Sequence, residues 1–217
     1  MVLCLRVFAT LRHCDICGFA LKNSGGHLRL VEISEYLVLI SEFKNYKPMR
    51  VLGIDPGSET LGWGVVEGSG VKYALVDFGT VKSSTRDAFS KRLLNIYDAV
   101  ADLMAEHSPD VLSVEDTFYA VNVGVALKLG QVRGLMLLLA EQRGLEIAEY
   151  APRLVKQTVV GYGNAEKHQV QQMVKILLKM KAVPTPHDAA DALAIAICHF
   201  HHAGLQDKIK RSLTKPK

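Results

Sequence analysis

The sequence predicts an α/β fold in which a mixed five-stranded sheet is flanked by helices. Three strand-like segments, at 51–54, 61–66 and 71–81, follow one another with only short turns between them. Strands joined by short turns pair antiparallel, so these segments form a meander. Farther along the chain, strand-like segments alternate with long amphipathic helices, which is typical of parallel strands joined by crossover helices. The sheet therefore combines an antiparallel meander of three strands with two parallel strands.

The first hairpin places a carboxylate at the rim of this sheet. The segment 51–54 is apolar and ends at Asp55. The dipeptide Pro56-Gly57 favours a tight turn, in which Gly57 can take a positive φ without Cβ strain. The returning strand, 61–66, contains two glycines that leave room for another element to approach closely. Because a fixed carboxylate is costly without compensation, we expect a cation or hydrogen bonds beside Asp55.

The remaining elements alternate between helix and strand, and the helices show apolar residues at helical spacing. The expected helices are 84–106, 120–143, 152–159, 165–180 and 186–202, and the expected strands are 111–115 and 145–150. The strand 111–115 ends in Glu115, just as the first strand ends in Asp55. A helix separates these two strands, so we expect them to pair in parallel and to place both acids on neighbouring strands.

Two further acids, Asp188 and Asp191, lie on the last predicted helix. A spacing of three residues places both on one helix face, and the alanines beside them would let that face approach the sheet. Converging acids without matching bases would repel one another, and divalent cations relieve such repulsion. Ligands that offer only oxygen suit Mg²⁺ or Mn²⁺. We therefore interpret Asp55, Glu115, Asp188 and Asp191 as a metal-binding site.

Each of these acids also has a structural explanation. Asp188 can close a capping box at the start of its helix, and Asp191 lies where the helix dipole favours an acid. Glu115 can be a surface residue at a strand end. A structural role for all four acids at once is the weaker interpretation, because the expected topology brings them together.

Length, composition and charge are those of an ordinary globular domain. The 217 residues are 49% hydrophobic and 22% charged, which is enough for one domain with a core. We find neither an apolar run of about 18 residues nor a signal peptide, so we expect a cytoplasmic protein without a membrane segment. The net charge of +4 is carried by the basic tail 204–217, which suits a polyanion partner or a solvated terminus equally well.

Residues 1–48 differ in pattern from the rest of the chain. They mix cysteines, glycines and short apolar runs without a sustained period. Cys14 and Cys17 form a C-x-x-C that is similar to half of a zinc site, but no second pair follows. Met49 directly precedes the first strand. We expect one domain at 49–203, preceded by an extension or by sequence upstream of the true start.

Several motifs occur together in one order along the chain. They are Leu52–Ser58, Leu127–Gly134, Val155–Gly161, Ala165–Lys167 and Asp188–Ala194. These motifs resemble the RuvC family of Holliday junction resolvases, and the resemblance extends from Met49 to about His202. It implies a ribonuclease H-like fold, which agrees with the order of elements predicted above. Residues 1–48 lie outside it.

The resemblance implies a Mg²⁺-dependent endonuclease that cuts four-way DNA junctions. Its catalytic acids correspond to Asp55, Glu115, Asp188 and Asp191, which would hold two Mg²⁺ ions, with Mn²⁺ as a substitute. The implied reaction is phosphodiester hydrolysis that leaves 5′-phosphate and 3′-hydroxyl ends. Two symmetric cuts need two active sites, so we expect a homodimer with the predicted helix 120–143 as its interface. The branch-migration proteins RuvA and RuvB are implied as partners.

The resemblance also points to DNA contacts. Lys156 and Lys167 fall in motifs whose lysines bind DNA in the family, and Lys128 and Arg133 lie in another matched motif. Phe118 corresponds to an aromatic residue that stacks on a base unpaired at the crossover. An aromatic residue of the loop that packs back onto the core is the alternative.

Two other functions remain open. The segments Asp55–Ser58 and Asp77–Thr80 look like the phosphate loops of actin-like or sugar-kinase ATPases. Those enzymes hold a nucleotide between two copies of this fold, and this chain has room for one. The non-enzymatic alternative is a catalytically weak, structure-specific DNA-binding module. The presence of all four acids argues against that module.

Overall fold

The computed structural model describes three stretches of the chain, 48–69, 72–116 and 122–213. Beyond residue 203 it describes the backbone alone. The chain divides into two compact units, 1–47 and 48–217, and the described residues all lie in the second unit. The C-x-x-C motif at Cys14 and Cys17 lies outside the described residues.

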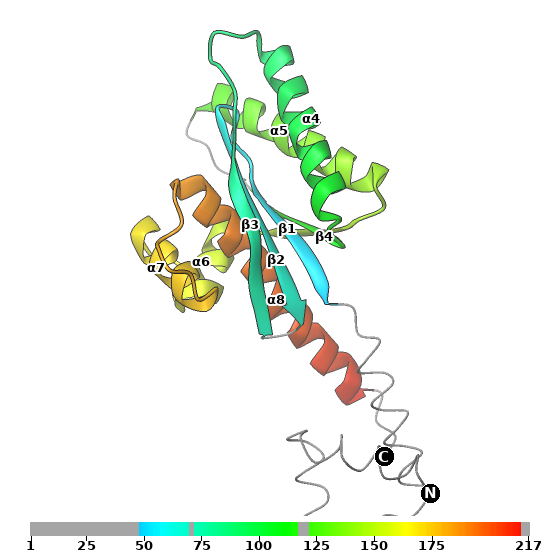
Figure 1. The fold of residues 1–217 in the computed structure, drawn as a ribbon, viewed down its shortest axis with the longest axis vertical. Helices are drawn as coiled ribbons and strands as arrows, with labels where there is room; N and C mark the ends of the chain where they lie inside the picture. The colour runs from blue at the N-terminus through cyan, green and yellow to red at the C-terminus, as the bar shows by residue number, and fades with distance from the viewer. Residues whose placement is uncertain (1–47, 70–71, 117–121, 214–217) are drawn as a thin grey trace, which may run out of the picture. The chain divides into compact units, whose positions relative to one another are not determined.

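The strands form one mixed sheet. Their bounds are β1 Met49–Asp55, β2 Thr60–Ser69, β3 Lys72–Lys82, β4 Val111–Glu115 and β5 Glu146–Tyr150. The sheet has five strands in the order β3-β2-β1-β4-β5 (Figure 1). The β1-β2-β3 meander is antiparallel, whereas β4 pairs in parallel with β1 and with β5. This confirms the predicted sheet, because short turns permit only antiparallel pairing and crossover helices permit parallel pairing.

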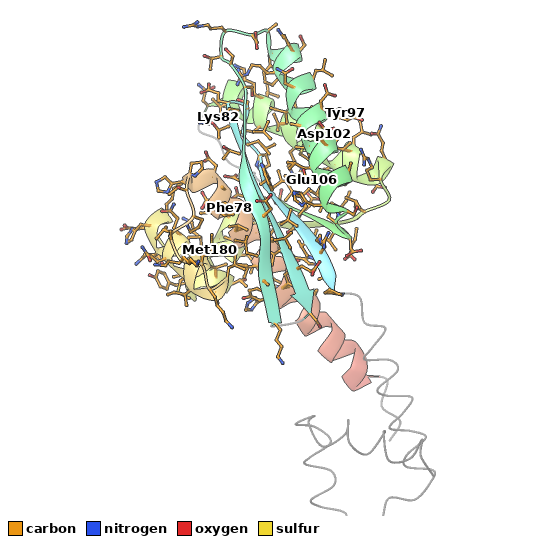
Figure 2. All side chains as sticks on the ribbon, viewed as in Figure 1. Phe78, Lys82, Tyr97, Asp102, Glu106 and Met180 are labelled. Carbon is orange, nitrogen blue, oxygen red and sulfur yellow. The ribbon has the colours of Figure 1, made fainter. Side chains whose placement is uncertain are left out.

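Helices cover both faces of the sheet. They are α4 Phe89–His107, α5 Val123–Gln142, α6 Pro152–Val160, α7 Lys167–Leu177 and α8 His187–Leu213. Helices α4 and α5 pack on one face, and α6, α7 and α8 pack on the other (Figure 1). Side chains alternate along β1, so Val51 faces the α8 side and Leu52 faces α4 and α5. The exposed residues Asp102 and Glu106 lie on the charged side of α4 (Figure 2).

Two helix boundaries differ from the predicted ones by five residues or more, and the others agree within three residues. Residues 84–88 form a turn before α4, in which the N–H of Asp87 donates to the carbonyl oxygen of Ser84 at 3.1 Å. Helix α8 continues to Leu213 and does not end at His202. Neither difference moves a predicted site residue, because the first concerns the approach to α4 and the second the far end of α8.

Candidate active site

Asp55 and Glu115 lie side by side at the ends of two parallel strands. In the pairing of β1 with β4, Ile54 is opposite Val114, so the next residue along each strand is an acid. The two carboxyl groups lie close enough for a hydrogen bond between them to act on both pKa values, and such a bond forms only when one of them is protonated. The expectation that both acids occupy neighbouring strands is confirmed.

The first turn of α8 reaches these strand ends because glycines and alanines meet where the helix crosses the sheet. Gly62 pairs with Asp55, and it also leaves space for the carbonyl oxygen of Asp188. A Cβ at Gly62 would overlap that oxygen. The close approach lets α8 bring Asp188 and Asp191 near Asp55, and the charge of each acts on Asp55.

Burial and mutual repulsion raise the pKa values of three of the clustered acids, Asp55, Glu115 and Asp191. The pKa of Asp55 rises to about 8, first because the group is buried and then because Glu115, Asp191 and Asp188 carry like charges. Burial also raises the pKa of Glu115 and the pKa of Asp191 above their ordinary values. The structure therefore brings all four predicted acids into one cluster with an excess of negative charge.

Two lysines lie at the edge of the acid cluster. The ammonium nitrogen of Lys167 is 3.5 Å from a carboxylate oxygen of Asp191. The charges of Lys167 and Lys156 also act to lower the pKa of Glu115, against the larger effect of its burial. Both lysines are predicted DNA contacts, and the structure places both beside the acids. Phe118, the predicted aromatic contact, lies outside the described residues.

The two predicted DNA contacts on α5 have other surroundings. Arg133 forms ion pairs with Glu149 and with Asp116, the latter at 3.5 Å. These pairs connect α5 to the ends of β4 and β5. The ammonium group of Lys128 lies 5.8 Å from the centre of the Phe89 ring, which is a cation–π contact between α5 and α4. A DNA phosphate at Arg133 would compete with two carboxylates.

A buried arginine, which sequence reasoning missed, holds the loop after Asp55. Arg92 donates a hydrogen bond from α4 to the carbonyl oxygen of Ser58. The signal in the sequence was its position, because Arg92 falls at helical spacing with the buried residues of α4. In the same loop Gly57 does not adopt the positive φ that glycine permits. Glycine is required there because a Cβ would overlap the carbonyl oxygen of Thr60.

The donor chemistry of the cluster fits a hard divalent cation. All four acids offer oxygen, which Mg²⁺ and Mn²⁺ prefer. A preformed metal site would need at least three His, Cys, Asp or Glu side chains with their donor atoms directed at one point. The part of the chain that the structure describes contains no such group. Cation binding would therefore require the acids to turn their carboxylate oxygens toward one point. The charge of the cation would offset the repulsion that raises the pKa of Asp55.

Known proteins share this chain's sequence over most of the described unit. The family model for crossover junction endodeoxyribonuclease RuvC matches residues 51–199. The protein of that name from Alkaliphilus metalliredigens is 45% identical over 162 residues, covering 75% of this chain and 99% of the relative. The protein of that name from Koribacter versatilis is 51% identical over 154 residues, covering 70% of this chain and 93% of the relative.

Solved structures share the fold. RuvC of Thermus thermophilus in complex with a Holliday junction substrate aligns with a TM-score of 0.69 at 36% identity, covering 73% of this chain and 96% of the other. The yeast mitochondrial Holliday junction resolvase Ydc2 aligns with a TM-score of 0.56 at 16% identity, covering 82% of this chain and 91% of the other. At that identity the second alignment is informative about the fold alone.

Proposed function

The chain belongs to the RuvC family of crossover junction endodeoxyribonucleases, and from this premise we propose that it resolves Holliday junctions by paired symmetric nicks. Its fold is ribonuclease H-like. The observation that carries the proposal is the cluster of Asp55, Glu115, Asp188 and Asp191, which β1, β4 and α8 bring together within the matched residues. The nicks would leave 5′-phosphate and 3′-hydroxyl ends that a ligase can reseal.

Two Mg²⁺ ions at these carboxylates would supply an activated water and stabilise the leaving oxygen of the cut strand, and Mn²⁺ could substitute for them. Asp55 would be the most rigidly held ligand, because β1 pairs with a strand on each side. Glu115, Asp188 and Asp191 would complete the ligand set. The excess negative charge of the cluster supports this assignment.

The lysines beside the acids would hold the DNA backbone. A phosphate could replace the ion pair of Lys167 with Asp191, and a bound cation would take over that acid. Lys156 lies near enough to Glu115 for its charge to act there, so it would meet a phosphate beside the same acids. Lys128, Arg133 and Phe118 remain proposed DNA contacts on the strength of the family resemblance. For Arg133, DNA binding would require exchange of its present ion pairs.

Symmetric cutting needs two active sites, and α5 offers the surface for a homodimer. Its residues Val123, Leu127 and Leu138 expose 73%, 64% and 51% of their surface. Spacings of four and eleven residues place them along one line of the helix. A second copy of the chain that covers this line would bury apolar surface on both partners. We assign the dimer interface to this face of α5.

The apolar character of α5 has a second explanation. Among the described residues, one helix is long and apolar enough to span a membrane by length and composition, and it is α5, with a mean hydropathy of 1.5. The helix still contains no unbroken apolar run of about 18 residues, because Lys128, Gln131 and Arg133 interrupt it. The ion pairs of Arg133 with Glu149 and Asp116 favour the dimer, because they hold α5 against the sheet. A cytoplasmic location and RuvA and RuvB as partners are proposed from the family.

The test is cleavage of a synthetic four-way junction with and without Mg²⁺. We expect the wild type to make symmetric nicks only with Mg²⁺, and Asp55→Asn to bind the junction but to cut it more than about a hundredfold more slowly. Asp77→Asn is the matched control, because Asp77 lies in the second segment that is similar to an ATPase phosphate loop. It should cut within about twofold of wild type.

Each alternative has its own result. Equal cleavage by wild type and Asp55→Asn would contradict the metal site. Binding without cleavage by the wild type would identify a structure-specific DNA-binding module. ATP hydrolysis that Asp77→Asn abolishes would favour the ATPase.

A further inference from the structure

Helix α6 presents a polar face directly beside the acid cluster. Arg153, Lys156 and Gln157 lie three and four residues apart, so they share one side of the helix. Val155 and Val159 are buried on the other side and fix the orientation of the helix against the core. The polar face therefore points away from the core by necessity.

The turn after α6 folds back along this polar face. Gly161 ends the helix with a φ of 101°, a conformation that favours glycine. Tyr162, Gly163 and Asn164 follow, and Gly163 lies so close to Arg153 that a Cβ there would overlap the Arg153 side chain. Helix and turn together line an open cavity of about 840 Å³.

The groups that line the cavity are chemically available. Arg153 and Lys156 have no ion-pair partner within 4 Å among the described residues. Tyr162 exposes 44% of its surface, and the amide side chains of Gln157 and Asn164 are exposed as well. The two cations suit the phosphate of a nucleotide, and the aromatic ring suits the face of its base. The two amides suit the hydrogen-bonding edge of the base.

The cavity also lies next to the proposed chemistry. Lys156 lines it and is close enough to Glu115 for the two charges to interact. A DNA strand that passes the acids would therefore lie within reach of the cavity at Lys156. Because the cavity is open rather than enclosed, a nucleotide can enter it while still joined to its neighbours in the strand.

We propose that this cavity binds one unstacked nucleotide of the cleaved strand next to the scissile phosphate. Arg153 and Lys156 hold phosphate oxygens, the ring of Tyr162 packs against the base, and Gln157 and Asn164 contact its edge. The inference rests on the proposed nuclease function and adds to it a subsite that distinguishes bases. The amides would then set a preference for the base beside the cut.

The test uses the full chain and a panel of four-way junctions that differ only in the bases flanking the scissile phosphate. Cleavage is measured for wild type, Tyr162→Ala, Tyr162→Phe and the double variant Gln157→Ala, Asn164→Ala. We expect Tyr162→Ala to cut about tenfold more slowly because stacking is lost, and Tyr162→Phe to cut within about twofold of wild type. The double variant should cut all junctions at similar rates.

Two controls separate the subsite from other effects. Val76→Ala removes an exposed side chain on β3, at the opposite edge of the sheet from β5 and α6, and should leave every rate unchanged. Thermal unfolding of each variant shows whether it is folded. A free mononucleotide, dAMP or dCMP, is added in a third series to compete with the strand.

The possible results separate the subsite from the nuclease function. If Tyr162→Ala cuts every junction like wild type, or if Tyr162→Phe loses as much activity as Tyr162→Ala, the subsite is wrong while the nuclease function stands. Binding of dAMP that depends on Tyr162, without any effect of Tyr162→Ala on cleavage, would reveal a site for free nucleotides and overturn the proposal. A wild type that cuts no junction would remove the proposed function itself, before any variant is compared.

Discussion

Each face of the sheet carries one helix with apolar residues on all sides, but the two helices differ in how much of that apolar surface is buried. On one face, α8 is buried from Ala192 to Phe200, between the sheet and the helices α6 and α7. On the other face, α5 buries Val132 and Met136, but Leu127 remains exposed. Apolar residues around a whole helix therefore indicate that every side is covered in the functional state, without saying by what. For α8 the cover is the chain itself, and for α5 we assign it to a second copy.

The residues at each contact explain the difference. Helix α8 approaches the backbone of the sheet through alanines, and Gly53 leaves space for the carbonyl oxygen of Ala192. Helix α5 approaches through larger side chains, such as Met136 and Leu139, that fill the space to β4 and β5. On its outer side, a Cβ added to Gly134 would meet no other described atom within 4 Å. We call the face under α8 closed, because the helix contacts the backbone of the sheet. We call the outer face of α5 open, because no described atom would contact a Cβ at Gly134.

The largest expected effect is at the closed face. Gly53→Ala should destabilise the protein by about 3 kcal/mol, because the new Cβ would overlap the carbonyl oxygen of Ala192 and push α8 away from β1. The acids of α8 would move with it. Urea unfolding measures the loss, and an unchanged midpoint would mean that α8 does not lie as close to the sheet as described.

The second-largest effect concerns the repulsion among the acids that this close packing brings together around Asp55. Asp55→Asn should stabilise the metal-free protein by about 2 kcal/mol at neutral pH. The raised pKa of Asp55 means that the folded protein keeps a proton which the unfolded chain has lost, so the free energy of unfolding falls as the pH rises from 3.8 through about 8. In the variant most of this slope should disappear.

Urea unfolding in EDTA across that pH range checks both points, with Asp102→Asn, an exposed acid of α4, as the control. Mg²⁺ should restore stability to the wild type at high pH and do less for Asp55→Asn. A wild type whose stability rises with pH in EDTA would contradict the charge excess of the cluster.

The open face is tested by Leu127→Glu. A charge in the middle of the exposed line on α5 should weaken the dimer at least about tenfold, or about 1.4 kcal/mol, and leave the fold of the monomer intact. Sedimentation equilibrium measures the dissociation constant. Leu94→Glu, at an exposed leucine of α4, compares a second position on this side. If Leu127→Glu dimerises like wild type, the interface lies elsewhere.

The smallest effect is the counterpart of Gly53→Ala on α5. Gly134→Ala adds a methyl group to an exposed helix position without overlap, so the monomer should gain about 0.5–1 kcal/mol from better helix propensity. The measurement is thermal unfolding in the Leu127→Glu background, which keeps dimerisation out of the comparison. A destabilised monomer would show that this face of α5 is covered within the chain.

Much of the candidate site could be predicted from the order of residues along the chain. Asp55 and Glu115 each follow an apolar strand, and Asp188 and Asp191 share a helix face, so their convergence followed from element order alone. The interactions of Arg133 could not be predicted, because its partners Asp116 and Glu149 lie at the ends of other elements. A matched motif indicates which residues recur, but not what each touches in this chain.

The sequence by itself determined the elements, their order and the four acids, because spacing, turn residues and capping act over a few neighbouring positions. Only the tertiary structure decided which charges have partners. It placed Arg92 under the loop after Asp55, and it left the outer face of α5 exposed. It also left Arg153 and Lys156 beside a cavity, without ion-pair partners among the residues that the structure describes. These outcomes depend on contacts between residues far apart in the chain, and no local pattern encodes such contacts.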